Sequence, residues 1–343
     1  MITREDVAKR ANVSPTVVSY VLNNSNYVSK EKREAVLKAV QELDYIPNQI
    51  ARSLLKKKSH QIAVLRGNAL NDMFNDLLFN MEGIAYKYGY YVSLLTIMQD
   101  ENGRAVDSYI DELISRHFDA IFVANSSLTE KQLRKLKRYG VPILLYPTKD
   151  YIGIDNEFSY LAPDYRSGIK TLIEMLIDYG HTKIAFMPNL LYPNVWDQAN
   201  HRFDGYVNAF AARGIPINVS YICRGGNRSI DQILMQVDRL FDPTKTKEPP
   251  TALYCDESIV AGKIMKHLTG QGIRVPEDVS LVSSSDSTIA QILTPRLTAV
   301  GVDAHALAEK AMEMIVEIID GKQPKGCFMP MTLYERESVR SLK

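Results

Sequence analysis

Hydroxyl and amide side chains gather in the segment from Ser14 to Asn23. Thr16, Ser19, Tyr20 and Asn23 are three or four positions apart, so a helix would bring them to one face and leave the valines on the other. Such groups donate to and accept from phosphates and base edges in a DNA groove. The segment therefore predicts recognition of nucleic acid.

The charge distribution favours the same interpretation. The 343-residue chain has a formal net charge of +1, but residues 1–60 hold eleven Lys/Arg against six Asp/Glu, a net of +5. The remaining residues hold thirty against thirty-four, a net of −4. A basic head on an acidic body indicates that the head meets a polyanion.

Helix signals surround the polar segment. Thr3 followed by Asp6 resembles a capping box, and Ser14 before Pro15 is an N-cap before a first-turn proline. A third helix is expected from Ser29 to about Asp44. Two short helices with a tight connection and a third packing helix predict a helix-turn-helix unit. A purely structural three-helix bundle is the alternative.

From residue 61 onward, short β-rich runs alternate with amphipathic helical stretches. This alternation predicts an α/β body of two successive doubly wound parallel-sheet lobes, with a ligand at the strand C-termini between them. The expected strands are 62–65, 91–95, 120–123, 143–145, 183–186, 220–222, 252–254 and 279–282; the expected helices are 74–88, 106–117, 133–139, 164–179, 198–213, 229–241 and 258–269.

Several classes of protein are not supported. The chain has no apolar run long enough to span a membrane and no signal-peptide core, and its three cysteines are widely spaced, so we expect a cytoplasmic protein. Phosphate-binding loops, a nucleophile elbow and metal-ligand histidine spacing are all missing. We therefore expect no enzymatic activity, cofactor or metal.

Four blocks in the head carry a family resemblance: Asp6–Lys9, Ala11–Ser14, Val18–Asn23 and Tyr45–Asn48. Their order and spacing resemble the LacI/GalR family of bacterial transcriptional regulators. The resemblance continues through the body in Gly180-His181, Arg202-x-x-Gly205-Tyr206, Asp256-Glu257, Val275–Ser280 and Glu335–Ser338, and so covers essentially the whole chain.

The resemblance implies roles for the head residues. The helix from Ser14 to Asn23 is the recognition helix. Base contacts are expected from Pro15, Thr16 and Tyr20, and Leu54 matches the leucine that wedges into the minor groove. Tyr20 stands where an arginine is frequent, which removes a bidentate guanine reader. Phosphate contacts are expected from Thr3, Ser14, Ser19, Asn23 and Tyr27, and a hinge helix from Asn48, Ile50, Ala51 and Lys56.

The resemblance also implies a body like the periplasmic binding proteins. We expect a helix-turn-helix domain at 1–46, a hinge at 47–60, a first lobe at 61–162 with 292–322, and a second lobe at 163–291 with 323–343. The partners implied are double-stranded operator DNA, a second copy of the chain and a small effector, expected to be a saccharide.

Arg202 is the leading candidate to bind that effector, because a guanidinium suits vicinal hydroxyls or a carboxylate. A surface arginine at a helix start is the alternative. Phe74 and Trp196 could line the site or simply pack in a core. Ser285 stands where relatives carry an aspartate, so a larger, phosphorylated or non-sugar effector is an alternative. The full set of candidates is Phe74, Asp164, Trp196, Arg202, Asp256, Ser285 and Asp286.

The predicted function is a dimeric, operator-binding repressor controlled by this effector. A solute-binding receptor or a sugar-processing protein on the same two-lobed body is the alternative. A secreted receptor would need an export signal, which the sequence does not show. An enzyme would need a nucleophile or a proton-transfer pair, and the sequence shows neither.

Overall fold

The computed structural model describes residues 2–24, 27–46, 58–66, 72–97, 106–124, 128–147, 157–188, 201–223 and 229–343. The chain divides into two compact units, Met1–Ser59 and His60–Lys343. Within the described ranges, no helix combines the length and apolar character that crossing a membrane requires.

The first unit contains three helices in its described part: α1 (Arg4–Arg10), α2 (Pro15–Asn23) and α3 (Lys30–Glu42). Apolar residues from all three meet in one small core, with Val7, Val18 and Val36 fully buried. Asn12 and Asn24 adopt left-handed backbone conformations at the ends of the first two helices, which asparagine tolerates better than most residues. The predicted helix-turn-helix arrangement is confirmed.

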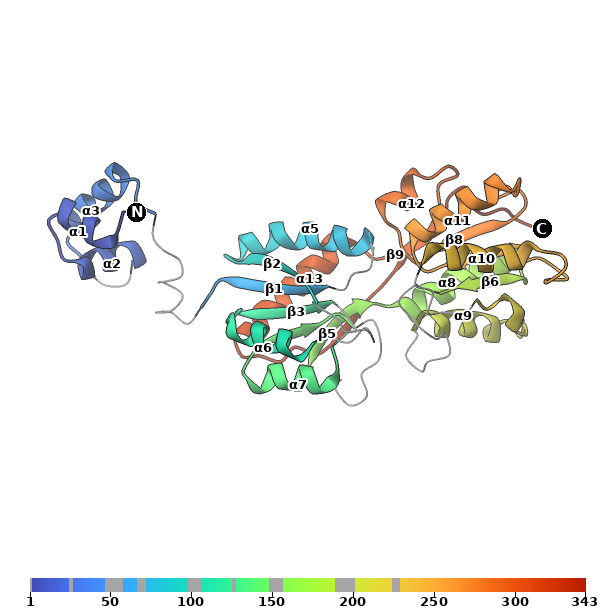
Figure 1. Cartoon of the computed structure of the whole chain (residues 1–343), viewed down its shortest axis with the longest axis horizontal. Coiled ribbons are helices and arrows are strands. Elements are labelled where there is room, and N and C mark those ends of the chain that lie inside the picture. Colours follow the sequence, from blue (N-terminus) through green and yellow to red (C-terminus); the bar gives the residue numbers. More distant parts are fainter. Residues whose placement is uncertain are drawn as a thin grey trace. The chain divides into compact units, whose positions relative to one another are not determined.

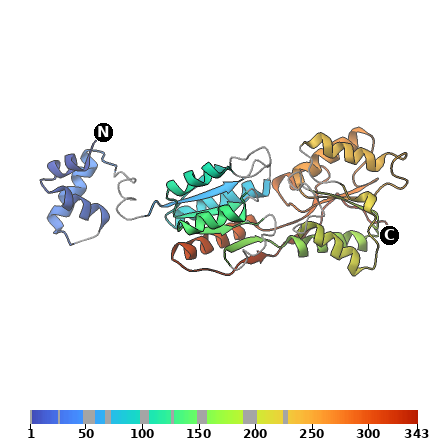
Figure 2. The same ribbon diagram turned by 60° about the horizontal axis from the view of Figure 1, so that its bottom comes forward.

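The second unit begins with a six-stranded sheet in the order β10-β5-β4-β3-β1-β2. Helices α5 and α13 cover one face of this sheet, and α6 and α7 cover the other (Figure 1, Figure 2). Its described elements are β1 (Gln61–Arg66), α5 (Asp72–Lys87), β2 (Tyr91–Thr96), α6 (Asp107–Ser115), β3 (Ala120–Ala124), α7 (Glu130–Arg138), β4 (Ile143–Leu145), β5 (Ser159–Pro163), α13 (Ala304–Ile319) and β10 (Cys327–Met329).

A five-stranded sheet follows in the order β11-β9-β8-β7-β6. Helices α8 and α9 pack on one face and α10 and α11 on the other. The described elements are α8 (Tyr165–Asp178), β6 (Ile184–Met187), α9 (His201–Ala212), α10 (Ile230–Phe241), β7 (Ala252–Cys255), α11 (Ser258–Gly270), β8 (Ser280–Ser283), α12 (Thr288–Ile292), β9 (Thr298–Gly301) and β11 (Thr332–Tyr334). The predicted α/β fold with a small helical head is confirmed.

The predicted boundaries between the lobes need correction. We expected 292–322 in the first lobe, but β9 pairs with β8 in the five-stranded sheet. We expected 323–343 in the second lobe, but β10 pairs with β5 in the six-stranded sheet. The chain therefore crosses between sheets after Gly301 and again after Met329. A four-residue apolar strand suits either sheet, so strand pairing, which local sequence does not encode, decides its place.

The expected strand at 220–222 is also wrong. Residues Val219–Tyr221 form a 3-10 turn, and one isolated bridge joins Ile222 to Phe186. The side chain of Asn218 accepts a hydrogen bond from the backbone N–H of Ser220 at 3.0 Å. Such a local side-chain bond offers the backbone an alternative to the sheet ladder.

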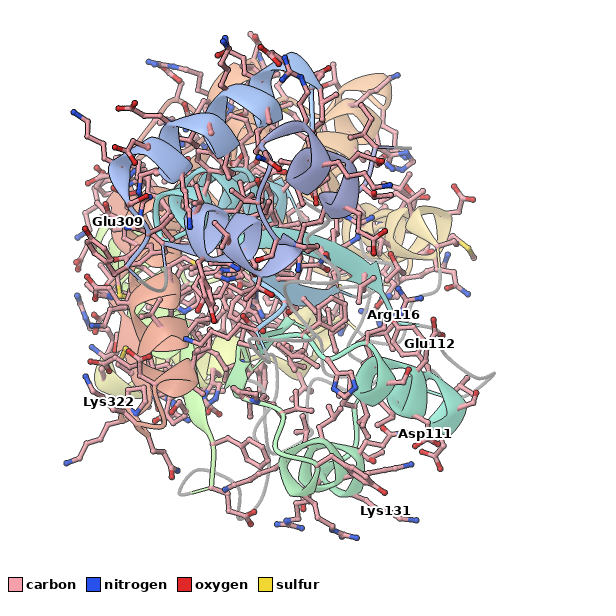
Figure 3. The ribbon with its side chains drawn as sticks, turned by 90° about the vertical axis from the view of Figure 1, so that its left-hand side faces the viewer. Asp111, Glu112, Arg116, Lys131, Glu309 and Lys322 are labelled. Carbon is pink, nitrogen blue, oxygen red and sulfur yellow. The ribbon has the colours of Figure 1, made fainter. Side chains whose placement is uncertain are left out.

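Charged side chains cover the outer surfaces of α6 and α7. Asp111, Glu112, Arg116 and Lys131 project outward from this region (Figure 3). Arg116 pairs with Glu112, and the ammonium group of Lys135 lies 2.6 Å from the carboxylate of Asp111. These exposed pairs contribute little stability individually, so the helices are held mainly by their buried inner faces.

A buried histidine fastens the C-terminal tail to the five-stranded sheet. His181 is fully buried, with Nδ1 2.9 Å from Thr251 Oγ1 and Nε2 2.9 Å from the carbonyl of Arg340. Burial is the main cause that lowers the pKa of His181 in the folded state. The unfolded chain, with an ordinary histidine pKa near 6.5, therefore takes up a proton first as the pH falls, and stability is lost below that value.

We expect the melting temperature to fall between about pH 6.5 and pH 5 more steeply in the natural chain than in His181→Gln. Replacement of the exposed His305 with Gln is the matched control and should leave the slope unchanged. Thermal melts across this pH range test the prediction; identical slopes for the natural chain and His181→Gln would contradict it.

Candidate functional site

The start of α2 is built from its own sequence. Ser14 is the N-cap, and its hydroxyl accepts a hydrogen bond from the Val17 N–H at 3.4 Å. Pro15 occupies the first turn, where its missing N–H is not needed. Val18 and Val21 are buried against α1 and α3. This anchoring turns the opposite side of α2 to solvent.

The predicted base-contacting residues lie on that outward side. Pro15 and Thr16 are exposed, and Tyr20, one turn further along, is half-buried. An exposed helix N-terminus with one apolar and one hydroxyl side chain can enter a major groove and read base edges. Leu54 lies outside the described residues.

The predicted phosphate-contacting residues divide into two groups. The backbone N–H and hydroxyl of Thr3 both donate to Asp6, at 2.8 and 2.7 Å, and these bonds lower the pKa of Asp6. Both hydrogen-bond donors of Thr3 are thus used within the N-terminal cap of α1. Ser14 accepts from Val17, and Ser19 accepts from Asn23 at 3.2 Å, so each serine keeps a proton to donate to a phosphate. Tyr27 is 96% exposed. The expected hinge residues Asn48, Ile50, Ala51 and Lys56 lie outside the described residues.

Arg202, in the first turn of α9, is buried, with 7% of its surface exposed. Its guanidinium carbon lies 3.6 Å from the centroid of the Tyr165 ring. A surface position, the alternative from the sequence, is therefore wrong. The stacked ring fixes the plane of the guanidinium and attracts its charge.

A pair of tyrosines joins this arginine to the first sheet. The hydroxyl of Tyr165 lies 3.5 Å from that of Tyr146, which follows β4. The Tyr146 ring makes edge contacts with Phe74 and Phe122, at centroid distances of 6.5 and 6.0 Å. Burial raises the pKa of both tyrosines, so both stay neutral. Phe74 and Arg202 therefore lie at the two ends of a row of contacting side chains, with Tyr146 and Tyr165 between them.

Two acidic residues lie near Tyr165. Asp256, directly after β7, is 1% exposed and accepts a hydrogen bond from the Tyr254 hydroxyl at 2.6 Å. Glu257 is also buried. Both carboxylates and Arg202 act electrostatically on Tyr165. Buried carboxylates beside a cation can accept hydrogen bonds from ligand hydroxyls.

Four other predicted effector residues remain, of which two have contacts elsewhere in the protein. Asp164 caps α8 by accepting from the Ser167 N–H at 3.1 Å. Asp286 lies 2.6 Å from Arg336, in a pair with side-chain exposures of 7% and 12%. Ser285 is buried, and its hydroxyl has no hydrogen-bond partner among the described residues. Trp196 lies outside the described residues. Asp164 and Asp286 thus already have structural roles.

The sequence interpretation missed Tyr146, Tyr165, Tyr254 and Glu257 as members of this group. Their common signal is position: each lies at or just beyond the carboxyl end of a parallel strand, where ligands of such sheets bind. Among the described residues, no three His, Cys, Asp or Glu side chains come close enough to hold a metal ion.

Both units of the chain match models of known protein families. Residues 3–48 match the family model of bacterial regulatory proteins of the lacI family, and residues 173–339 match the periplasmic binding protein-like domain. The chain is 31% identical to the HTH-type transcriptional repressor PurR of Vibrio parahaemolyticus over 335 residues, covering 94% of this chain and 93% of the relative. It is 27% identical to catabolite control protein A of Priestia megaterium, covering 93% of each chain.

The fold is also similar to that of a solved structure. The Lac repressor dimer bound to operator and the anti-inducer ONPF aligns with a TM-score of 0.83 and 22% identity, over 99% of both chains. This similarity extends over head and body alike. The chain therefore belongs to the LacI family of bacterial regulatory proteins and is a DNA-binding transcriptional regulator.

Proposed function

We propose that the chain acts as a homodimeric repressor that binds a two-fold symmetric operator and responds to a small effector, a saccharide or saccharide derivative. The observation that carries the DNA part is the anchored α2, which presents Pro15 and Thr16 to solvent. Related structures support the rest: one is a Lac repressor dimer bound to operator, and another is a complex of the regulator CelR with cellobiose.

An exposed apolar patch on the first lobe supports the dimer. Phe79 and Tyr86, seven positions apart on one face of α5, are 80% and 69% exposed. Tyr91 and Leu94 on the neighbouring edge strand β2 are 65% and 47% exposed (Figure 1). The rings of Tyr86 and Tyr91 make an edge contact at 6.1 Å. Large apolar side chains exposed on a helix and on its neighbouring edge strand mark a protein interface, and a two-fold operator calls for two copies.

Phe79→Asp is expected to convert the dimer to monomer and to weaken operator binding by at least about tenfold, because two linked heads bind more tightly than one. Sedimentation velocity and operator titration measure the two effects. Tyr139→Asp, at a 63% exposed aromatic residue outside the patch, is the control. A Phe79→Asp variant that stays dimeric would remove this patch from the interface.

Selection from random duplex DNA with the full chain tests the proposed function. We expect an enriched motif with two inverted half-sites, bound with an affinity that falls steeply as salt rises. A selection that enriches no motif, or a single unrepeated one, would contradict the proposal. The enzymatic alternative is not favoured, because the relatives compared above are named as regulators.

A further inference from the structure

Arg66, which no part of the sequence interpretation singled out, is the last residue of β1. Its side chain is half-buried, and its Nε atom is buried with no hydrogen-bond partner in the described part of the chain. No ion pair among the described residues includes it. A buried guanidinium N–H without a hydrogen-bond partner is costly unless another group accepts from it.

Strand alternation places this side chain. Ile62 and Val64 belong to the core beneath α5 and α13, whereas Ala63 and Leu65 belong to the core on the opposite face. Because side chains alternate along a strand, Arg66 extends from the same face as Ile62 and Val64. Phe74 and Tyr146 belong to that same core.

The strand register places Arg66 and Tyr146 at the same level of the sheet. Arg66 pairs with Ala124 of β3, and Tyr146 directly follows Leu145, the register partner of Val123. Arg66 and Tyr146 are thus two strand spacings apart, about 10 Å, at the carboxyl edge of the sheet. Ala124 between them has only a methyl group, so no long side chain of β3 separates the guanidinium from the tyrosine.

The two arginines of this region differ in their surroundings. Arg202 stacks on the Tyr165 ring, and Asp256 and Glu257 act electrostatically on the same tyrosine. Negative groups of the protein therefore act on the same ring as Arg202. Arg66 has no such carboxylate among the described residues, so its charge remains for a ligand. Carboxylates near Arg202 suit ligand hydroxyls, whereas a lone guanidinium suits a phosphate or carboxylate.

We infer that the effector carries an anionic group, a phosphate or carboxylate on a polyhydroxylated body, and that Arg66 binds this group. The inference rests on the proposed effector site. The hydroxylated body would lie along Phe74, Tyr146 and Arg202, with the anionic end over Ala124. Arg66 is then the residue that distinguishes the charged effector from its neutral parent.

Thermal melts of the full chain with matched ligand pairs test this inference. The probes are ribose and ribose 5-phosphate, glucose and glucose 6-phosphate, glucose and glucuronate, and inorganic phosphate against chloride at equal ionic strength. We expect at least one anionic probe to raise the melting temperature progressively as its concentration rises. Its neutral parent should need at least ten times the concentration to give the same shift. Arg66→Gln should lose this response and Arg66→Lys should retain part of it.

Arg138→Gln, at an exposed arginine on α7, is the matched control and should respond like the natural chain. Anions also stabilise proteins generally, by exclusion from their surface, but that effect would appear equally in Arg66→Gln. The inference is overturned if no anionic probe stabilises the natural chain, or if Arg66→Gln responds as the natural chain does. A neutral sugar that stabilises the natural chain at least as strongly as its anionic counterpart would overturn the inference while leaving the proposed effector site standing.

Discussion

Arg202→Ala should abolish the response of operator binding to the effector while leaving effector-free operator affinity within about twofold of the natural chain. The guanidinium is buried on the Tyr165 ring, so the loss removes charge-assisted hydrogen bonds that contribute about 1.5–3 kcal/mol each. We expect effector affinity to fall by roughly 100-fold, since each 1.4 kcal/mol corresponds to a factor of ten.

Isothermal titration with a stabilising ligand, followed by operator titration with and without it, measures both quantities. Arg166→Ala is the matched control, because Arg166 is an exposed arginine on the neighbouring helix, paired with Asp204 at 2.8 Å. This control should bind the effector normally. An Arg202→Ala protein with unchanged effector affinity would exclude Arg202 from the site.

Leu54→Ala should weaken binding to the selected operator by about 10- to 100-fold without changing effector binding. The expectation comes from the family resemblance, in which this leucine separates base pairs in the minor groove. Unstacking a base step costs a few kcal/mol, and alanine is too short to replace the wedge. Binding to unselected DNA should change little, because that binding depends mainly on phosphates.

Fluorescence anisotropy with specific and unselected duplexes gives both affinities. Leu37→Ala provides the control, since Leu37 is a leucine of the same unit, 51% exposed on α3, at a position with no proposed role in DNA binding. We expect it to bind the operator normally. Equal losses on both duplexes for Leu54→Ala would point to a general defect and exclude a specific wedge.

Local signals in the sequence were sufficient for most of the fold. The cap at Ser14 and the proline after it predicted where α2 begins, and Asp164 predicted the start of α8. Such signals act within one or two turns of chain, so reading them needs no knowledge of distant contacts. The helix α13 and the strands β5, β9, β10 and β11 were not predicted. β10 and β11 have three residues each, too few to show a period, whereas the equally short β4 was predicted because all three of its residues are aliphatic.

The candidate site was only partly predictable. Arg202 was found because a motif surrounds it in the sequence. Tyr146 and Arg66 were missed, since their importance comes from strand register, which places residues from separate strands in one row. Asp286 was expected to bind the effector, but Arg336, far along the chain, already neutralises it. Pairings of that range depend on the tertiary fold and leave no trace in local sequence.

The most direct test of a dimeric operator-binding regulator compares two duplexes of equal length, one with both inverted half-sites of the selected motif and one with a single half-site. We predict that the full chain binds the double site at least about 100-fold more tightly, because the second head binds at a high effective concentration. Equal affinity for the two duplexes, at low and at physiological salt, would contradict the account.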